Sequence, residues 1–248
     1  MKILNGKNAI ITASNRGIGN AVLVDFAING ANIWACSRKK SVEFENQLKD
    51  LSKAHNVDIK PIYFDVTDSE QMKEAYKTIR AEKKNVDVLV NCAGVFNVDF
   101  FQMTRMDTVK EVFAVNVFAA MELTQYVLKS MIRQKSGSII NISSVSGLDA
   151  KPGNCTYGSS KSALISFTKS LAAEIGPLGI RANSIAPGPT FTDMMKKIYD
   201  KIGDKVLNSC AMNRWAEVEE IAAAVTFLAS DRSSFINGQV IRVDGGSK

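Results

Sequence analysis

Histidine, the side chain most often used for acid–base chemistry, is almost absent from this chain. Its one histidine, His55, stands in the polar stretch KDLSKAHNVD, which is typical of an exposed helix end. The four cysteines are scattered, without a CxxC pair or a nearby histidine, so the sequence predicts neither a metal site nor a disulfide framework. Proton transfer in this protein would therefore fall to another residue type.

Long apolar runs are also missing. The stretch IAAAVTFLA is well short of the ~18–20 residues that cross a bilayer, and the N-terminus lacks the apolar region and cleavage site of a signal peptide. We expect a cytoplasmic protein with no membrane partner. The net charge of +6 comes from dispersed basic residues, without a nucleic-acid-binding module, so no nucleic-acid partner is expected either.

The 248 residues alternate β-branched runs with amphipathic stretches. Strands are expected at about 7–12, 31–37, 58–66, 86–91, 136–143, 179–187 and 238–246. Helices are expected at about 17–30, 41–55, 68–84, 104–134, 156–175 and 217–230. Such strands, nearly continuous in Ile and Val, are typical of a sheet buried on both faces. We predict an α/β fold with a single domain over 1–248, a Rossmann-type doubly wound, seven-stranded parallel sheet with helices on both faces. Its dinucleotide-binding part would cover about 1–140, and its substrate loop about 187–215.

The stretch IITASNRGIG, residues 10–19, joins the first strand to the first helix through a turn with Gly17 and Gly19. Backbone N–H groups at a helix N-terminus bind phosphate, so this turn predicts a nucleotide site. Ala13 stands where many such turns have glycine. If the position needs a positive φ, alanine costs on the order of 1 kcal/mol there.

The second predicted strand ends in ACSRKK. Ser37 occupies the place of the carboxylate that would exclude a 2′-phosphate, and Arg38 and Arg16 could hold one with planar guanidinium groups. These residues favour NADP(H) over NAD(H). The alternative is that both arginines are ordinary exposed side chains.

Tyr157 and Lys161 are four residues apart and would share one helix face. A nearby ammonium and an oxidised nicotinamide would favour the phenolate and lower the tyrosine pKa. Ser143 and Ser144 end the preceding strand at the carboxyl edge of the sheet, where ligands of such folds bind. Asn116 puts an amide into an otherwise apolar helix and needs hydrogen-bond partners there.

Together, the glycine turn, Asp65-Val66, NCAG at 91–94, Asn116, the serine pair, Tyr157-x-x-x-Lys161, IAPGPTFTDM and GQVIRVDGG resemble the short-chain dehydrogenase/reductase family over nearly the whole chain. That resemblance implies a catalytic tetrad. Its members would be Asn116, Ser144, Tyr157 and Lys161. Tyr157 would give a proton to the substrate carbonyl, and Ser144 would bind the carbonyl oxygen. Lys161 would hold the nicotinamide ribose, and Asn116 would anchor a water that links Lys161 to solvent, from which the proton is replaced.

The same resemblance places Asp65 at the adenine, residues 91–94 along the cofactor, and residues 187–192 by the nicotinamide. The full set of expected cofactor contacts is Thr12, Ser14, Asn15, Arg16, Gly17, Ile18, Gly19, Ser37, Arg38, Asp65, Val66, Asn91, Ala93, Gly94, Tyr157, Lys161, Pro187, Gly188, Thr190 and Thr192.

Within the family, the chain most resembles 3-oxoacyl-acyl-carrier-protein reductases, which implies an NADPH-dependent oxidoreductase of fatty-acid synthesis. Arg133, Lys135 and Arg181 are candidates for binding an acidic carrier protein, and Met194, Met195, Ile198 and Tyr199 for lining an apolar substrate loop. The resemblance also implies a homotetramer, with a homodimer as the alternative. Two other functions remain open: an NADPH-dependent carbonyl or alcohol dehydrogenase acting on ketones, sugars or steroids, and a non-catalytic nucleotide-binding scaffold.

Overall fold

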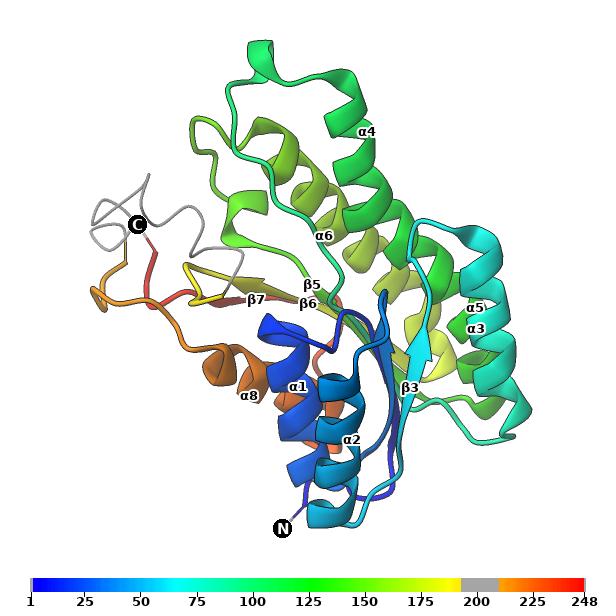
Figure 1. The fold of residues 1–248 in the computed structure, drawn as a ribbon. Helices are drawn as coiled ribbons and strands as arrows, with labels where there is room; N and C mark the ends of the chain where they lie inside the picture. The colour runs from blue at the N-terminus through cyan, green and yellow to red at the C-terminus, as the bar shows by residue number, and fades with distance from the viewer. Residues whose placement is uncertain (1, 193–209, 248) are drawn as a thin grey trace.

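Short runs of buried apolar residues form one parallel sheet in the computed structural model, which describes residues 2–192 and 210–247. The sheet has seven strands in the order β3-β2-β1-β4-β5-β6-β7. The strands are β1 (Asn8–Ile11), β2 (Asn32–Ser37), β3 (Ile59–Tyr63), β4 (Val88–Asn91), β5 (Gly137–Ile142), β6 (Ile180–Pro187) and β7 (Val240–Val243). The predicted doubly wound sheet is confirmed (Figure 1).

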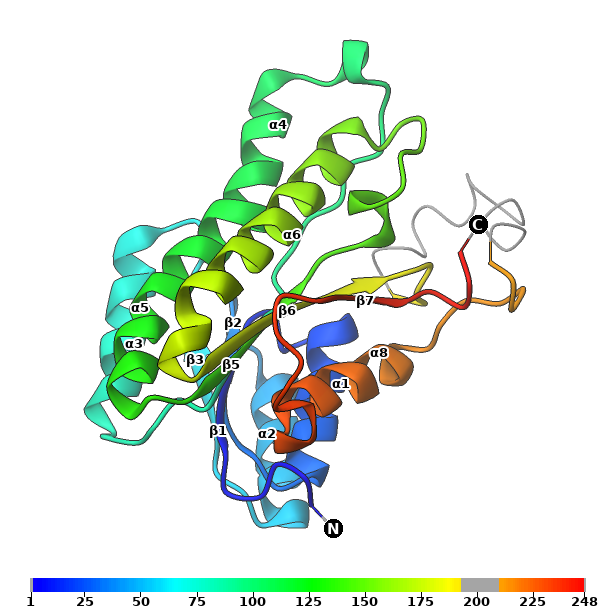
Figure 2. The ribbon, with the colours of Figure 1, turned by 180° about the vertical axis from the view of Figure 1, so that it is seen from behind.

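Helices cover both faces of the sheet (Figures 1 and 2). One layer consists of α1 (Gly17–Ile28), α2 (Val42–His55) and α8 (Val218–Ala229), and the other of α3 (Ser69–Ala81), α5 (Ala119–Gln134) and α6 (Cys155–Ile175). Each layer closes its own apolar core. Phe26, Leu48 and Leu228 are buried in the first core, and Met72 and Val127 in the second. Because both faces of the sheet are buried, apolar and polar residues do not have to alternate along its strands.

Local sequence sets several helix ends. The Ser41 side chain accepts a hydrogen bond from Phe44 N at the start of α2, and the Asp68 side chain accepts one from Gln71 N at the start of α3. The helix expected over 104–134 is interrupted. It consists of α4 (Met106–Phe113), a π-helical turn over Ala114–Phe118 and α5, and the turn contains the candidate Asn116.

The winding of the sheet reverses between its two central strands. From β1 the chain continues to β2 and β3 on one side, and β4 then returns to the other side of β1. The carboxyl ends of β1 and β4 therefore lie at the switch point, where open α/β sheets bind their ligands. Pro61 lies in β3, at an edge of the sheet, where a missing N–H is tolerated.

Candidate active site

The turn between β1 and α1 requires unusual backbone angles. Ala13 has φ +52° and Gly17 has φ +54°, both in the left-handed region. The substitution at Ala13 therefore carries the cost foreseen for a positive φ, of the order of 1 kcal/mol. A Cβ atom at Gly19 would overlap the Ala13 carbonyl, so only glycine lets α1 begin this close to the strand.

Thr12 and Ser14 use their side chains to hold this turn in place. Both are buried. Thr12 Oγ1 accepts hydrogen bonds from Cys92 N at 2.9 Å and Ala93 N at 3.0 Å, and Ser14 Oγ donates to Cys36 O at 3.0 Å. These bonds tie the turn to the ends of β4 and β2. Both residues thus shape the crevice, and their hydroxyl groups are engaged within the protein.

The residues expected to select the nucleotide lie at the end of β2 and just after β3. Ser37 is buried and donates from Oγ to Lys39 O, whereas the side chain of Arg38 is 69% exposed. The Arg38 guanidinium lies 4.0 Å from Asp65 Oδ2. Hydrogen bonds from Thr67 N and Thr67 Oγ1, with a smaller contribution from Arg38, lower the pKa of Asp65. Asp65 is therefore ionised at neutral pH.

Asn91 belongs to a buried polar network rather than to an open surface. Its amide donates to Thr124 Oγ1 at 3.1 Å and to Asn141 Oδ1 at 2.8 Å, and Asn141 in turn donates to Thr168 Oγ1. The network joins β4 and β5 to α5 and α6. The side chain of Asn91 therefore fixes the floor of the crevice, and Ala93, held by Thr12, continues it.

Asn116 finds its partners across the crevice wall. Its Oδ1 accepts from Val95 N at 2.8 Å, and its Nδ2 donates to Val95 O at 3.0 Å and to Ser160 Oγ at 3.0 Å. Ser160 Oγ donates to Tyr157 O at 2.7 Å. Ser160 therefore links the side chain of Asn116, in the π-helical turn, to the backbone carbonyl of Tyr157, the candidate proton donor. No sequence motif predicted this link.

Tyr157 and Lys161 lie together on α6, as the spacing predicts. The Lys161 ammonium lies 5.8 Å from the centre of the Tyr157 ring and donates to Ile142 O at 2.9 Å. Burial lowers the pKa of Lys161 to about 8. A Cβ at Gly94 would lie 3.4 Å from both Lys161 Nζ and Asn116 Oδ1. The NCAG segment therefore lies next to the side chains of Lys161 and Asn116.

Without a bound nicotinamide, the pKa of Tyr157 is not lowered as the sequence predicted. Burial raises the pKa of Tyr157 to about 12, and a hydrogen bond with Ser144 lowers it only in part. Burial outweighs that bond, and the phenol is protonated at neutral pH. Ser144 also accepts a hydrogen bond from Ser146 N at 3.1 Å, which orients its hydroxyl group. By contrast, Ser143 is held by Ile185 O and Ser184 Oγ, which supports Ser144 as the reactive serine.

The segment after β6 closes the other side of the crevice. Gly188 passes so near Asp244 that a Cβ would lie 2.7 Å from its Cα, and Thr190 Oγ1 donates to Gly188 O at 3.0 Å. The Thr192 methyl group is 3.7 Å from the Cβ position of Gly17. Residues 187–192 therefore reach across to the turn after β1. The candidates Met194, Met195, Ile198 and Tyr199 lie outside the described residues.

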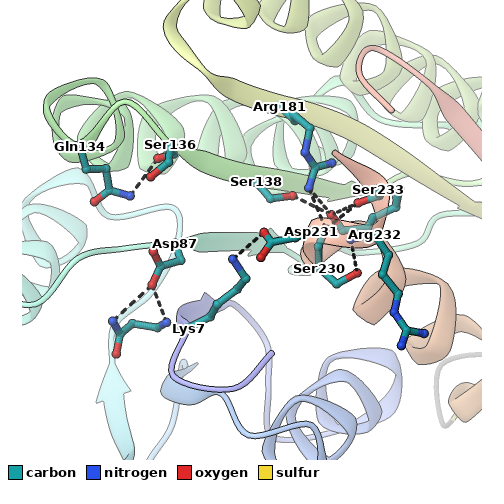
Figure 3. A network of polar contacts seen from close by, with 12 residues as sticks. Lys7, Asp87, Gln134, Ser136, Ser138, Arg181, Ser230, Asp231, Arg232 and Ser233 are labelled. Carbon is teal, nitrogen blue, oxygen red and sulfur yellow. Dashed lines mark hydrogen bonds and ion pairs between the residues drawn. The ribbon is translucent and has the colours of Figure 1, made fainter. Parts of the chain in front are cut away.

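The three candidate carrier-binding residues, Arg133, Lys135 and Arg181, lie at the amino edge of the sheet, opposite the edge with Tyr157. The Arg181 guanidinium donates to Leu228 O at 2.8 Å, Ile236 O at 3.2 Å and Ser230 O at 3.3 Å. Figure 3 shows Arg181 pointing toward the segment that contains Ser230 and Ser233. Arg181 thereby ties the amino end of β6 to the end of α8 and to the segment that follows it. Arg133 and Lys135 end α5 just before β5, so they also lie at the amino edge.

The crevice suits a nicotinamide dinucleotide. Within the described chain, the N-cap residue of α1, Arg16, makes no side-chain capping bond, and the first helical turn has no acidic residue. Its N–H groups and helix dipole therefore favour an anion. Ala13, Gly17 and Gly19 keep the approach to the N-terminus of α1 free of bulky side chains, and the ammonium of Lys161 lies close to Gly94, just after β4.

No group of His, Cys, Asp and Glu residues among 2–192 and 210–247 could hold a metal ion. No helix in the same part of the chain has the length and apolar character that crossing a membrane requires.

Known proteins share this architecture. Residues 12–248 match the family model described as enoyl-(acyl carrier protein) reductase. A 3-oxoacyl-[acyl-carrier-protein] reductase of Thermotoga maritima is 36% identical over 245 residues, which cover 98% of either chain. A 3-oxoacyl-[acyl-carrier protein] reductase of Brucella melitensis superposes with a TM-score of 0.90 and 29% identity, over 99% of this chain and 92% of that one. The structure of ElxO with NADP bound gives a TM-score of 0.88 and 32% identity, over 97% and 98% of the two chains. With the tetrad residues assembled at one sheet edge, this chain belongs to the short-chain dehydrogenase/reductase family.

Proposed function

We propose that the protein is a cytoplasmic, NADPH-dependent oxidoreductase that reduces the 3-oxo group of an acyl thioester, linked to acyl carrier protein or CoA, to a hydroxyl group. The single observation that carries this proposal is the geometry around Tyr157: its hydroxyl group is hydrogen-bonded to Ser144, and the Lys161 ammonium lies 5.8 Å from the centre of its ring. The named activity of the Thermotoga maritima and Brucella melitensis relatives supports the substrate class.

The tetrad accounts for the proton that the reduction consumes. The hydride for the carbonyl carbon would come from the bound nicotinamide cofactor. Tyr157 gives its phenolic proton to the carbonyl oxygen, and Ser144 donates a hydrogen bond to that oxygen as negative charge develops on it. Lys161, which donates to Ile142 O, stabilises the resulting phenolate by its charge. Its own proton would then be replaced from solvent, and the family resemblance implies a water near Asn116 for that step.

The choice of NADP(H) rests on charge at the end of β2. Ser37 adds no negative charge there, and Arg38 is exposed and near the crevice. Arg16, at the N-terminus of α1, is exposed as well. Two guanidinium groups form charge-assisted hydrogen bonds with a 2′-phosphate dianion, whereas a 2′-hydroxyl gains much less from them.

The proposal extends to the oligomeric state and to the functional parts of the domain. We propose residues 1–140 as the dinucleotide-binding part, 187–215 as the substrate loop, and a homotetramer, or a homodimer, as the working form. Exposed aromatic side chains support association: Phe118, the last residue of the π-helical turn, is 60% exposed, and Phe235 before β7 is fully exposed.

The decisive experiment follows NADPH absorbance with acetoacetyl-CoA for the wild type and Tyr157→Phe in parallel. We expect turnover by the wild type, and a loss of at least about a thousandfold in the variant with unchanged NADPH binding. Turnover of simple diketones or sugars without acyl thioesters would instead identify a carbonyl or alcohol dehydrogenase. NADPH binding without turnover of any carbonyl would identify a nucleotide-binding scaffold.

Arg38→Ala tests the cofactor choice. Loss of its charge-assisted hydrogen bonds should raise the KM for NADPH about tenfold or more and leave the KM for NADH nearly unchanged. Lys39→Ala, which removes the neighbouring positive charge, is the matched control. An unchanged KM for NADPH in Arg38→Ala, or better turnover with NADH by the wild type, would contradict the choice of NADP(H).

A further inference from the structure

Arg242, on β7, joins two acidic side chains at the carboxyl edge of the sheet. Its Nη1 and Nη2 donate to the two oxygens of Asp149 at 3.1 Å and 2.6 Å, and its Nε donates to Asp244 Oδ2 at 2.8 Å. A planar fork of donors fixes a carboxylate in direction as well as in distance. Hydrogen bonds from Arg242 lower the pKa of Asp149, so this carboxylate is ionised at neutral pH. None of the three residues belongs to the tetrad or to the expected cofactor contacts.

Asp149 ends the short turn that begins at Ser144. Residues Val145–Gly147 form a single 3-10 turn, and Asp149 N donates to Val145 O at 2.8 Å. Within the same turn, Ser144 Oγ accepts a hydrogen bond from Ser146 N. A displacement of Asp149 is therefore passed on, through a few hydrogen-bonded residues, to the hydroxyl group of Ser144.

Helix α6 holds the middle of the same turn. A Cβ atom at Gly147 would lie 2.8 Å from the backbone carbonyl carbon of Lys161, and Ser162 Oγ donates to Gly147 O at 2.6 Å. Arg242 holds the end of the turn from another element, because β7 lies beside β6 at the edge of the sheet (Figure 2). The turn after Ser144 is thus fixed at two points by segments that are far apart in the sequence.

The second carboxylate connects Arg242 to the segment that follows β6. The Asp244 side chain is only 8% exposed, and a Cβ atom at Gly188 would lie 2.7 Å from Asp244 Cα. Gly188 N also donates to Val243 O at 3.0 Å. Arg242 therefore lies between the turn of Ser144 and the start of residues 187–192, which are expected beside the nicotinamide.

The exposure of the ion pair favours a role in geometry over one in stability. The side chains of Arg242 and Asp149 are each 35% exposed. Ion pairs at such positions contribute little to the free energy of unfolding, because water competes for both charges. By contrast, small shifts of a group that contacts the reacting atoms can lower a rate by about a hundredfold.

We propose that Arg242 is a positioning residue that acts through Asp149: it sets the orientation of the Ser144 hydroxyl group toward the substrate carbonyl oxygen, relative to the segment after β6. This inference rests on the proposed function, which assigns the carbonyl oxygen to Ser144. The competing explanation is an ion pair that only joins two parts of the surface.

The test is a double-mutant cycle on the single-turnover rate of NADPH oxidation, measured with acetoacetyl-CoA and with a diketone at saturating concentrations. Asp149→Ala and Arg242→Met should each lower the rate about tenfold to a hundredfold. Arg242→Lys, which keeps the charge and loses the fork of donors, should recover part of that loss. In the Ser144→Ala background the same substitutions should cost less than twofold, because no hydroxyl group is left to position.

Asp149→Ala breaks only the half of the contact at the serine turn, so its dissociation constant for NADPH should stay within twofold of the wild-type value. It also carries the test if Arg242→Met does not fold. Lys60→Met is the matched control, because it breaks an ion pair with Glu82 of 2.7 Å at the other edge of the sheet, and its rate should equal that of the wild type.

An unchanged rate in Asp149→Ala, or an equal loss with and without the Ser144 hydroxyl group, would overturn the inference and leave the proposed function intact. If the wild type reduces the diketone and not acetoacetyl-CoA, the proposed substrate class is wrong, and the cycle with the diketone still decides the role of Arg242. A wild type that reduces neither compound would overturn both proposals.

Discussion

Ala13→Gly should stabilise the protein, because Ala13 has a left-handed backbone. At φ +52°, a Cβ costs about 1–2 kcal/mol relative to glycine. Glycine in turn loses more backbone entropy on folding, about 0.5–1 kcal/mol. The difference leaves a gain of about 0.5–1 kcal/mol, or a rise in Tm of about 2 °C for a chain of this length.

The assay is thermal and urea unfolding of the ligand-free protein, with two matched variants. Lys135→Gly replaces a side chain at φ +54° on the C-cap of α5 and should also stabilise. Ala223→Gly, in the middle of α8, should destabilise by about 1 kcal/mol, because there glycine gains no relief from strain. NADPH affinity should change less than twofold, since the turn presents its backbone to the phosphate. A destabilised Ala13→Gly beside a stabilised Lys135→Gly would refute the reasoning.

Two further predictions concern the walls of the crevice. Thr12→Val leaves Cys92 N and Ala93 N without their acceptor and should lower the free energy of unfolding by about 1–3 kcal/mol in urea titrations; wild-type stability would show that these N–H groups find another partner. Burial lowers the pKa of Lys161 to about 8, whereas its value in the unfolded chain is 10.5. Between these two pH values the unfolded chain binds more protons than the folded one. The contribution of Lys161 to the free energy of unfolding therefore rises with pH across that window. The difference in urea midpoint between the wild type and Lys161→Met should grow across that window in favour of the wild type, and a constant difference would contradict the lowered pKa.

Local patterns in the sequence were enough to predict the order of the strands and helices. Runs such as AII in NAII and IWAC in NIWACS predict buried strands because their consecutive residues are apolar, and they form the centres of β1 and β2. The pairing of Tyr157 with Lys161 also followed from spacing alone, since residues four apart share a helix face whatever surrounds the helix. The break at Asn116 did not, because the π-helical turn depends on contacts with Val95 and Ser160.

What the sequence by itself determined is therefore the fold class, the edge of the sheet where the site lies and the residue types that meet there. Only the tertiary structure decided how each side chain is used. Arg181 became an anchor for three backbone carbonyls, and Asn91 became part of a buried network. Burial raises the pKa of Tyr157, a shift opposite to the one that the spacing to Lys161 suggested. The physical reason is that hydrogen-bond partners and burial come from chain segments far apart, as where Thr12 binds Cys92 across 80 positions, and no local pattern encodes such contacts.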